Sequence, residues 1–181
     1  MKLWLARHAQ PLIASGICYG ATDVPADAQA TLDAAQNLSM ALPLGLLVLT
    51  SSLQRCELLK HSLQALRPDL SYKTDARLVE MNFGTWEGQR WDVIEQAELA
   101  RWTDNFGEHA CGGAESVGQF MARVGAVWDE TVGAGQDSVW ITHAGVIRAA
   151  SLLAQGIRTP SDAQQWPQQA PGFGQWREVA I

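Results

Sequence analysis

The sequence contains few cysteines, no cluster of basic residues and no hydrophobic segment long enough to cross a membrane. Its three cysteines, Cys18, Cys56 and Cys111, are an odd set without CxxC spacing, so we expect reduced thiols and no disulfide, as is usual in the cytoplasm. A net charge of −6 without a basic stripe argues against nucleic-acid binding. The apolar stretch at 42–50 is far shorter than the roughly 20 residues that span a bilayer.

The N-terminal segment also does not resemble a signal peptide, because Arg7 and His8 interrupt its apolar run. We therefore expect a cytoplasmic protein without a membrane or nucleic-acid partner. The 181 residues, of which 47% are hydrophobic and 18% charged, suit a single domain over 1–181 with a substantial core. The eight tryptophans are expected in the core or in pocket walls, since their rings bury large apolar surfaces.

Strand-like and helix-like segments alternate along the chain. Continuous apolar runs at 2–6, 46–50 and 138–142 predict parallel strands that are covered on both faces, and weaker strands are expected at 70–74 and at 174–181, the last at an edge. Helical spacing or helix-length composition predicts helices at 25–42, 53–68, 88–102, 115–133 and 145–156. This order predicts an α/β fold, a three-layer sandwich around a mainly parallel sheet.

Polar residues follow each of the three strong strands, at 7–8, 51–55 and 142–145. Because the carboxyl ends of parallel strands share one rim of the sheet, Arg7, His8 and the other polar groups should converge there. Arg55 places a cation near the start of a predicted helix, where the helix dipole disfavours it by roughly 0.3–1 kcal/mol. A bound anion would compensate, although each residue taken alone could also be an ordinary solvated or salt-bridged side chain.

Five motifs, in this order, resemble those of the histidine phosphatase superfamily, which includes cofactor-dependent phosphoglycerate mutases and many small phosphatases. They are "RHA" at 7–9, "SSLQR" at 51–55, "EMNFGTWEG" at 80–88, "GGAES" at 112–116 and "THAG" at 142–145. The resemblance covers nearly the whole chain and implies a phosphoglycerate mutase-like fold. It also implies no cofactor and no metal, since fixed cations would supply the positive charge.

The resemblance implies specific roles for residues of these motifs. His8 would be the nucleophile that becomes phosphohistidine, while Arg7, Arg55 and His143 would bind the phosphoryl oxygens and Glu80 would donate the proton. A neutral imidazole is a competent nucleophile near pH 7, and fixed cations stabilise the charge that spreads over the phosphoryl oxygens.

Further substrate contacts are expected from Ala144, Gln10 and Trp86. With Trp91 and Phe83, Trp86 would form an aromatic wall around the organic part of a small phosphorylated metabolite. The segment 84–113 is expected to be a lid insertion. The stretch "GICYGATDVP" at 16–25 and the short chain most resemble the alpha-ribazole phosphatases of cobalamin biosynthesis.

The sequence departs from the family motifs at Ala9 and Ala144, where the family has glycine. Ala14 stands where the family often has a polar residue, and Gln10, Ser15 or Thr22 could substitute for it. The two alanines keep open a catalytically silent phosphoester-binding protein as an alternative to a phosphatase. A mutase and a zinc site made of His8, His143 and Cys18 are two further alternatives. A monomer and a homodimer are both compatible with the sequence.

Overall fold

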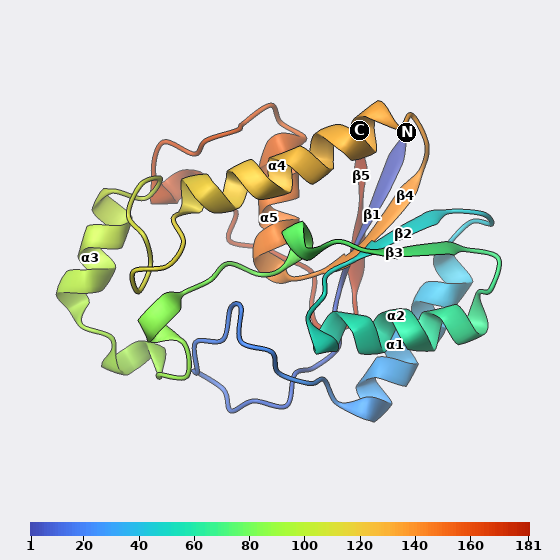
Figure 1. Cartoon of the computed structure of the whole chain (residues 1–181), viewed down its shortest axis with the longest axis horizontal. Helices are drawn as coiled ribbons and strands as arrows, with labels where there is room; N and C mark the ends of the chain where they lie inside the picture. The colour runs from blue at the N-terminus through green and yellow to red at the C-terminus, as the bar shows by residue number, and fades with distance from the viewer.

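A five-stranded sheet forms the middle layer of the computed structural model, which describes residues 1–181 (Figure 1). The strands are β1 (Lys2–Arg7), β2 (Leu47–Thr50), β3 (Ser71–Thr74), β4 (Ser138–Thr142) and β5 (Trp176–Ala180). Their order is β3-β2-β4-β1-β5. The first four are parallel, and β5 pairs antiparallel with β1 at the edge. The α/β prediction is confirmed, with a mixed sheet.

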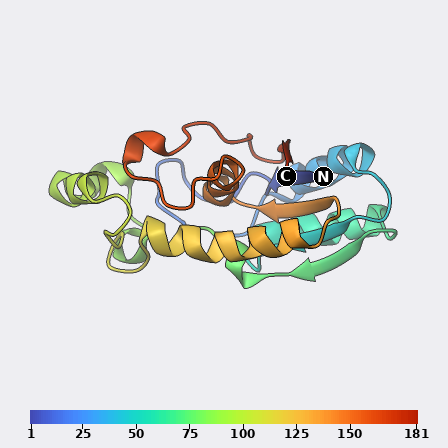
Figure 2. The same cartoon turned by 90° about the horizontal axis from the view of Figure 1, so that it is seen from above.

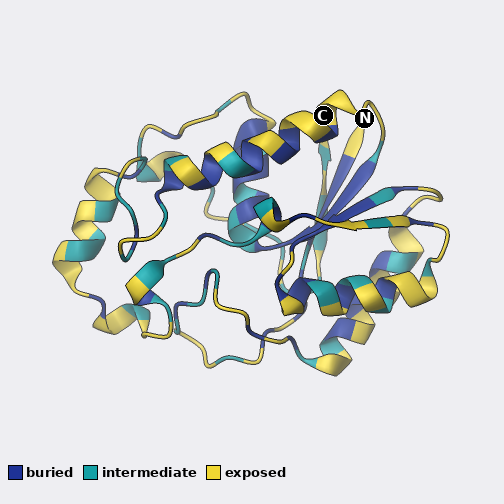
Figure 3. Cartoon of the chain, viewed as in Figure 1, coloured by how far each residue is buried: buried dark blue, intermediate teal, exposed yellow.

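Helices cover both faces of this sheet, and the alternation of side chains along the strands explains why. Leu3 and Leu5 of β1 pack in one core with α4 (Val117–Gly133) and α5 (Ala144–Leu153), whereas Trp4 and Ala6 pack in a second core on the opposite face. That second core includes α1 (Ala28–Ala41) and α2 (Gln54–Leu66). Every residue of β4 is buried, as expected for a central strand covered on both faces (Figure 3).

The register of the strands aligns their carboxyl ends. Arg7, the last residue of β1, pairs with Thr142, the last residue of β4, and Thr50 at the end of β2 pairs with Ile141. The residues that follow these three strands therefore begin at one rim of the sheet, as the sequence predicts.

The predicted helix at 88–102 is confirmed only from 96 onward and is wrong for 88–95. The chain instead forms two 3₁₀ turns, Gly84–Trp86 and Trp91–Val93, followed by α3 (Gln96–Asp104). The amide of Cys18 donates to the carbonyl of Gln89, so 88–90 pairs with a distant loop and cannot continue a helix. Figure 2 shows α3 at the end of the molecule farthest from the sheet, where none of its residues is buried.

Several helix boundaries also differ from the prediction by one to three residues. Helix α1 begins at Ala28 because the Asp27 carboxylate caps it, accepting from the amide of Ala30 at 2.8 Å. Helix α5 ends at Leu153, before a turn in which Gly156 adopts a φ of 78°. None of the helices has the length and apolar character that crossing a bilayer requires.

Candidate active site

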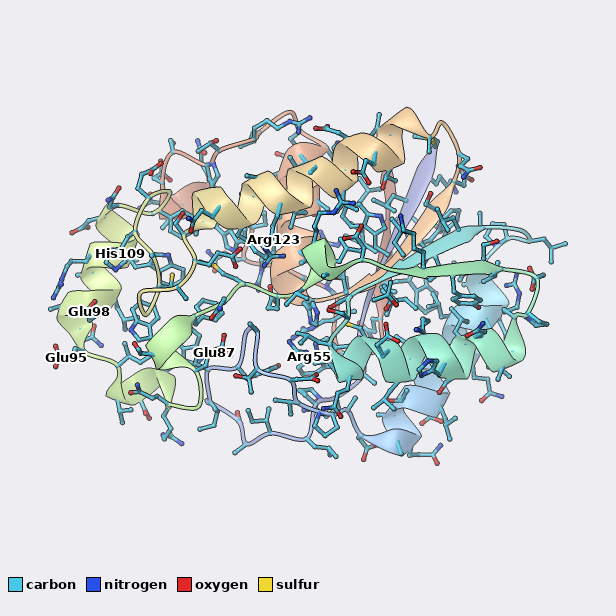
Figure 4. All side chains as sticks on the ribbon, in the orientation of Figure 1. Arg55, Glu87, Glu95, Glu98, His109 and Arg123 are labelled. Carbon is cyan, nitrogen blue, oxygen red and sulfur yellow. The ribbon has the colours of Figure 1, made fainter.

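The ends of β1 and β4 bring two buried histidine rings together. His8 follows β1, His143 follows β4, and their ring centroids lie 5.1 Å apart. Arg55 lies in the first turn of α2 and is completely buried, and Figure 4 shows it at the start of this helix. The convergence of these three side chains at the rim of the sheet agrees with the sequence prediction.

The backbone determines which nitrogen of His8 is free. Its Nδ1 lies 2.7 Å from the carbonyl oxygen of Ala9. A carbonyl oxygen can only accept, so Nδ1 carries the proton and Nε2 has the free lone pair. Burial, with help from the charge of Arg55, lowers the pKa of His8 to about 3. The ring is therefore neutral near pH 7 and presents Nε2 as a nucleophile.

Arg55 is held by three donated hydrogen bonds. Its Nη1 and Nη2 donate to the carbonyl oxygens of Thr22 and Gly20 at 2.8 and 2.7 Å, and its Nε donates to Nδ1 of His143 at 3.2 Å. A guanidinium carries five N–H donors, so two remain for a ligand. The loop that contains Thr22 is held in turn by Glu87, whose carboxylate accepts from the amide of Ala21 at 2.8 Å.

The ring of His143 lies behind the cavity beside His8 rather than in its wall. Because Nδ1 accepts from Arg55, the proton is on Nε2, which lies 2.8 Å from Oγ of Ser51. Burial lowers the pKa of His143 well below its usual value, and Arg55 adds to this effect. Both ring nitrogens thus have protein partners, and His143 supports Arg55 in this geometry instead of offering a free nitrogen to a phosphoryl group.

Arg7 is oriented by the segment that precedes β5. Its guanidinium carbon lies 3.8 Å from the centre of the Phe173 ring, and its Nη1 donates to the carbonyl of Pro171 at 3.0 Å. The Nε of Arg7 is buried and has no protein partner. Burial also lowers the pKa of Arg7. An arginine stacked on an aromatic ring in this way keeps a fixed direction, which suits recognition of an anion.

Glu80 completes the group of polar residues around His8. Its carboxylate accepts from the amide of Met81 at 3.0 Å and from the amide of Gly145 at 2.9 Å. A Cβ atom at position 145 would lie 2.2 Å from the Glu80 carboxylate. Gly145, the glycine of "THAG", is therefore required by this contact, whereas Ala144 fits its place in the wall of the site.

Two neighbouring cavities meet at Glu80. The first, of about 190 Å³, is lined by Arg7, His8, Arg55 and Glu80, together with Ile17, Tyr19, Gly20, Phe83, Trp91, Ala144 and Arg148. The second, of about 270 Å³, is mostly apolar and contains aromatic side chains from four segments: Phe83, Trp91, Trp102, Phe106, Phe120 and Trp166. Both cavities share Glu80, Phe83, Trp91 and Arg148.

Two predicted substrate contacts lie elsewhere. Gln10 is exposed and lines neither cavity, and Trp86 is buried behind Trp91, with ring centroids 6.4 Å apart. The zinc alternative does not assemble, because no group of three or more His, Cys, Asp or Glu side chains could hold a metal ion. All three cysteines are free and buried, as predicted. Burial raises the pKa of both Cys18 and Cys111 to about 12.

Sequence reasoning missed Tyr19, Arg148 and Phe173. Tyr19 lies beside Arg55, whose guanidinium carbon is 5.5 Å from its ring centre, and burial raises the pKa of its hydroxyl. Arg148 carries a buried Nε without a protein partner and lines both cavities. Arg148 is the fifth residue of α5, beyond its first turn, so the electrostatic argument applied to Arg55 does not identify it. No local signal marks Phe173.

These features define the class of protein. A neutral, buried imidazole with a free Nε2 faces two arginines and a carboxylate at the carboxyl ends of parallel strands, an arrangement suited to binding a phosphoryl group beside a nucleophile. The chain belongs to the histidine phosphatase superfamily (branch 1), whose family model matches residues 3–171. Its fold is phosphoglycerate mutase-like, as in solved structures of phosphatases.

Solved structures with the same fold cover almost the entire chain. A mycobacterial glucosyl-3-phosphoglycerate phosphatase has 23% identity and a TM-score of 0.81, covering 99% of this chain and 89% of its own. The protein TTHB049 from Thermus thermophilus has 28% identity and a TM-score of 0.73, with coverage of 99% and 93%. A candidate alpha-ribazole-5′-P phosphatase from Escherichia coli has 22% identity and a TM-score of 0.79, with coverage of 98% and 89%. No curated protein matches the sequence.

Proposed function

We propose that the protein hydrolyses phosphomonoesters without a metal, through a phosphohistidine at Nε2 of His8. The observation that carries this proposal is the hydrogen bond from Nδ1 of His8 to the Ala9 carbonyl, which leaves Nε2 as the free nitrogen inside the smaller cavity. Arg7 and Arg55 border the same cavity and supply the positive charge that a phosphoryl group needs.

The reaction proceeds in two steps. First, Nε2 attacks phosphorus, the bond from phosphorus to the ester oxygen breaks, and Glu80 protonates the departing alkoxide. Then water attacks the phosphohistidine, Glu80 accepts a proton from that water, and the bond between phosphorus and Nε2 breaks to release phosphate. Glu80 returns to its protonated form, so atoms and protons balance over the cycle.

The larger cavity indicates the kind of alcohol that leaves. It adjoins Glu80, where the ester oxygen would lie, and aromatic rings form most of its wall. Such a wall suits a flat, weakly polar group, and Arg148 would contact the part of the substrate between that group and the phosphate. We therefore propose a small phosphorylated metabolite as substrate, with alpha-ribazole 5′-phosphate of cobalamin biosynthesis as the leading candidate.

The segment 84–113 would then act as a lid. It contributes Trp91, Trp102 and Phe106 to the wall of the larger cavity, so its position determines access to the organic part of the substrate. We place the enzyme in the cytoplasm as a monomer or homodimer, without nucleic-acid or membrane partners.

Rapid quench with alpha-ribazole 5′-phosphate tests the proposal. We expect an acid-labile phosphoryl adduct that maps to His8 by mass spectrometry and is absent from the His8→Ala variant. Tight binding of the ester without any adduct would instead identify a silent binding protein. Exchange between 2- and 3-phosphoglycerate that exceeds phosphate release would identify a mutase. Either result would overturn the proposed hydrolysis.

A further inference from the structure

Beside the segment that carries Glu80, an ion pair joins Glu115 to Arg123. Arg123 lies on α4, and Glu115 lies just before the residue that caps this helix. The Nε and Nη2 of Arg123 donate to the two carboxylate oxygens of Glu115 at 2.7 and 3.0 Å. Both side chains are mostly buried, with 22% and 14% of their areas exposed. Figure 4 shows Arg123 extending from α4 toward the middle of the molecule.

The same two side chains hold the backbone on both sides of Glu80. Nη1 of Arg123 donates to the carbonyls of Arg77 and Val79 at 2.7 and 2.6 Å, and Nη2 donates to the carbonyl of Glu80 at 3.1 Å. The Glu115 carboxylate accepts from the amide of Asn82 at 2.9 Å. The segment 77–82 is thus fixed from α4 and the residue before its cap by hydrogen bonds to charged groups, which are about twice as strong as those between neutral groups.

This arrangement bears directly on the carboxylate of Glu80. Its only hydrogen-bond partners are two backbone amides, those of Met81 and Gly145. No side chain holds the carboxylate, so its position follows the backbone of its own segment. A displacement of that backbone would move the carboxylate relative to Nε2 of His8.

We propose that Glu115 and Arg123 are positioning residues, which hold Glu80 where it can transfer a proton to the leaving group. The proposal rests on the proposed phosphatase function. Neither residue lines the cavity that contains His8, so neither touches the phosphoryl group. Both residues act by fixing the position of the Glu80 carboxylate, and a misplacement of a catalytic group by about 1 Å can lower the rate 10²-fold.

Two phosphate esters distinguish a misplaced Glu80 carboxylate from a general loss of protein stability. The ester p-nitrophenyl phosphate releases a phenolate that departs without protonation, whereas 2-phenylethyl phosphate releases an alkoxide that needs a proton. For both esters kcat/KM reports the formation of phosphohistidine. We expect Arg123→Lys to lower kcat/KM about 10²-fold for the phenylethyl ester and less than about threefold for the nitrophenyl ester. The near-isosteric Glu115→Gln should show the same selectivity, so the comparison does not depend on one variant folding.

Arg67 offers a matched control elsewhere in the fold. Like Arg123, it pairs with a carboxylate, that of Asp69, and donates to backbone carbonyls, here those of Ser39, Leu42 and Pro43. None of these residues lines either cavity of the site. Arg67→Lys should lower the Tm and leave the ratio of kcat/KM for the two esters at its wild-type value.

A double-mutant cycle completes the test. In a Glu80→Gln background, Arg123→Lys should reduce turnover of the phenylethyl ester by less than about threefold further, because no acid remains to be positioned. Equal losses with both esters, or a full further loss in that background, would overturn the positioning role while leaving the phosphatase function intact. Failure of the wild-type protein to hydrolyse either ester would overturn the proposed function itself and the positioning role with it.

Discussion

The amide of Gly145 donates to the carboxylate of Glu80 at 2.9 Å, and there is no room between them for a side chain. This contact links the segment after β4 to the acid of the site. It explains why a methyl group is accommodated at Ala144 and excluded at the next position, although both belong to the same motif.

Gly145→Ala tests this contact. A methyl group at position 145 must displace the Glu80 carboxylate, so we expect kcat/KM for 2-phenylethyl phosphate to fall about 10²-fold. Gly133→Ala is the control, because its Cβ atom would meet nothing within 4 Å. Equal Tm values for the two variants would exclude unfolding as the cause of a loss of activity confined to Gly145→Ala. Unchanged activity in that variant would contradict the steric argument.

The buried His8 should make stability depend on pH. Its pKa is about 3 in the folded protein and near 6.5 when unfolded, so between these values the unfolded state binds more protons. Stability should therefore decrease as the pH falls from 6.5 toward 3, with His8 contributing up to about 1.4 kcal/mol per pH unit. Urea unfolding measured between pH 4.5 and 7 should show that the unfolding free energy of His8→Gln changes less steeply with pH than that of the wild type.

His61 provides the control for this experiment, since its side chain is 63% exposed. His61→Gln should leave the dependence of the unfolding free energy on pH close to that of the wild type. Identical slopes for His8→Gln and the wild type would show that His8 protonates equally in both states.

Phe173 should strengthen phosphate binding by holding the Arg7 guanidinium in place. The stacking contact of 3.8 Å fixes the guanidinium, and such contacts contribute about 0.5–2 kcal/mol. Phe173→Leu should weaken binding of inorganic phosphate about tenfold, measured by calorimetry, while Phe173→Tyr, which keeps the ring, should bind as the wild type does. Equal affinities in all three proteins would show that Arg7 needs no aromatic support.

Trp91 should select the organic part of the substrate. It lines both cavities and packs edge-on against Phe83, with ring centroids 5.3 Å apart. Trp91→Ala should raise the KM for 2-phenylethyl phosphate about tenfold more than the KM for ethyl phosphate, which cannot fill the aromatic cavity. Trp91→Phe should retain most of the preference. Equal increases for both esters would place the aromatic group of the substrate elsewhere.

Much of the site could be predicted because it depends on short local patterns. Apolar runs of strand length identify buried parallel strands, and the residues after such strands meet at one rim whatever the intervening chain does. His8, Arg55 and His143 were found in this way. The same reasoning could not predict that both ring nitrogens of His143 have protein partners. These partners, Arg55 and Ser51, come from α2 and the turn before it.

The sequence alone thus determined the layered α/β fold, the strand ends and the residues that converge there, because hydrophobic periodicity is local and alternation of strands with helices favours a parallel sheet. Tertiary structure decided the rest. Pairing of 88–90 with the loop at Cys18 prevented the predicted helix from beginning at 88, and packing before β5 placed Phe173 on Arg7. Contacts between residues far apart in the chain leave no local pattern, and the hydrogen bonds that orient Glu80 are of this kind.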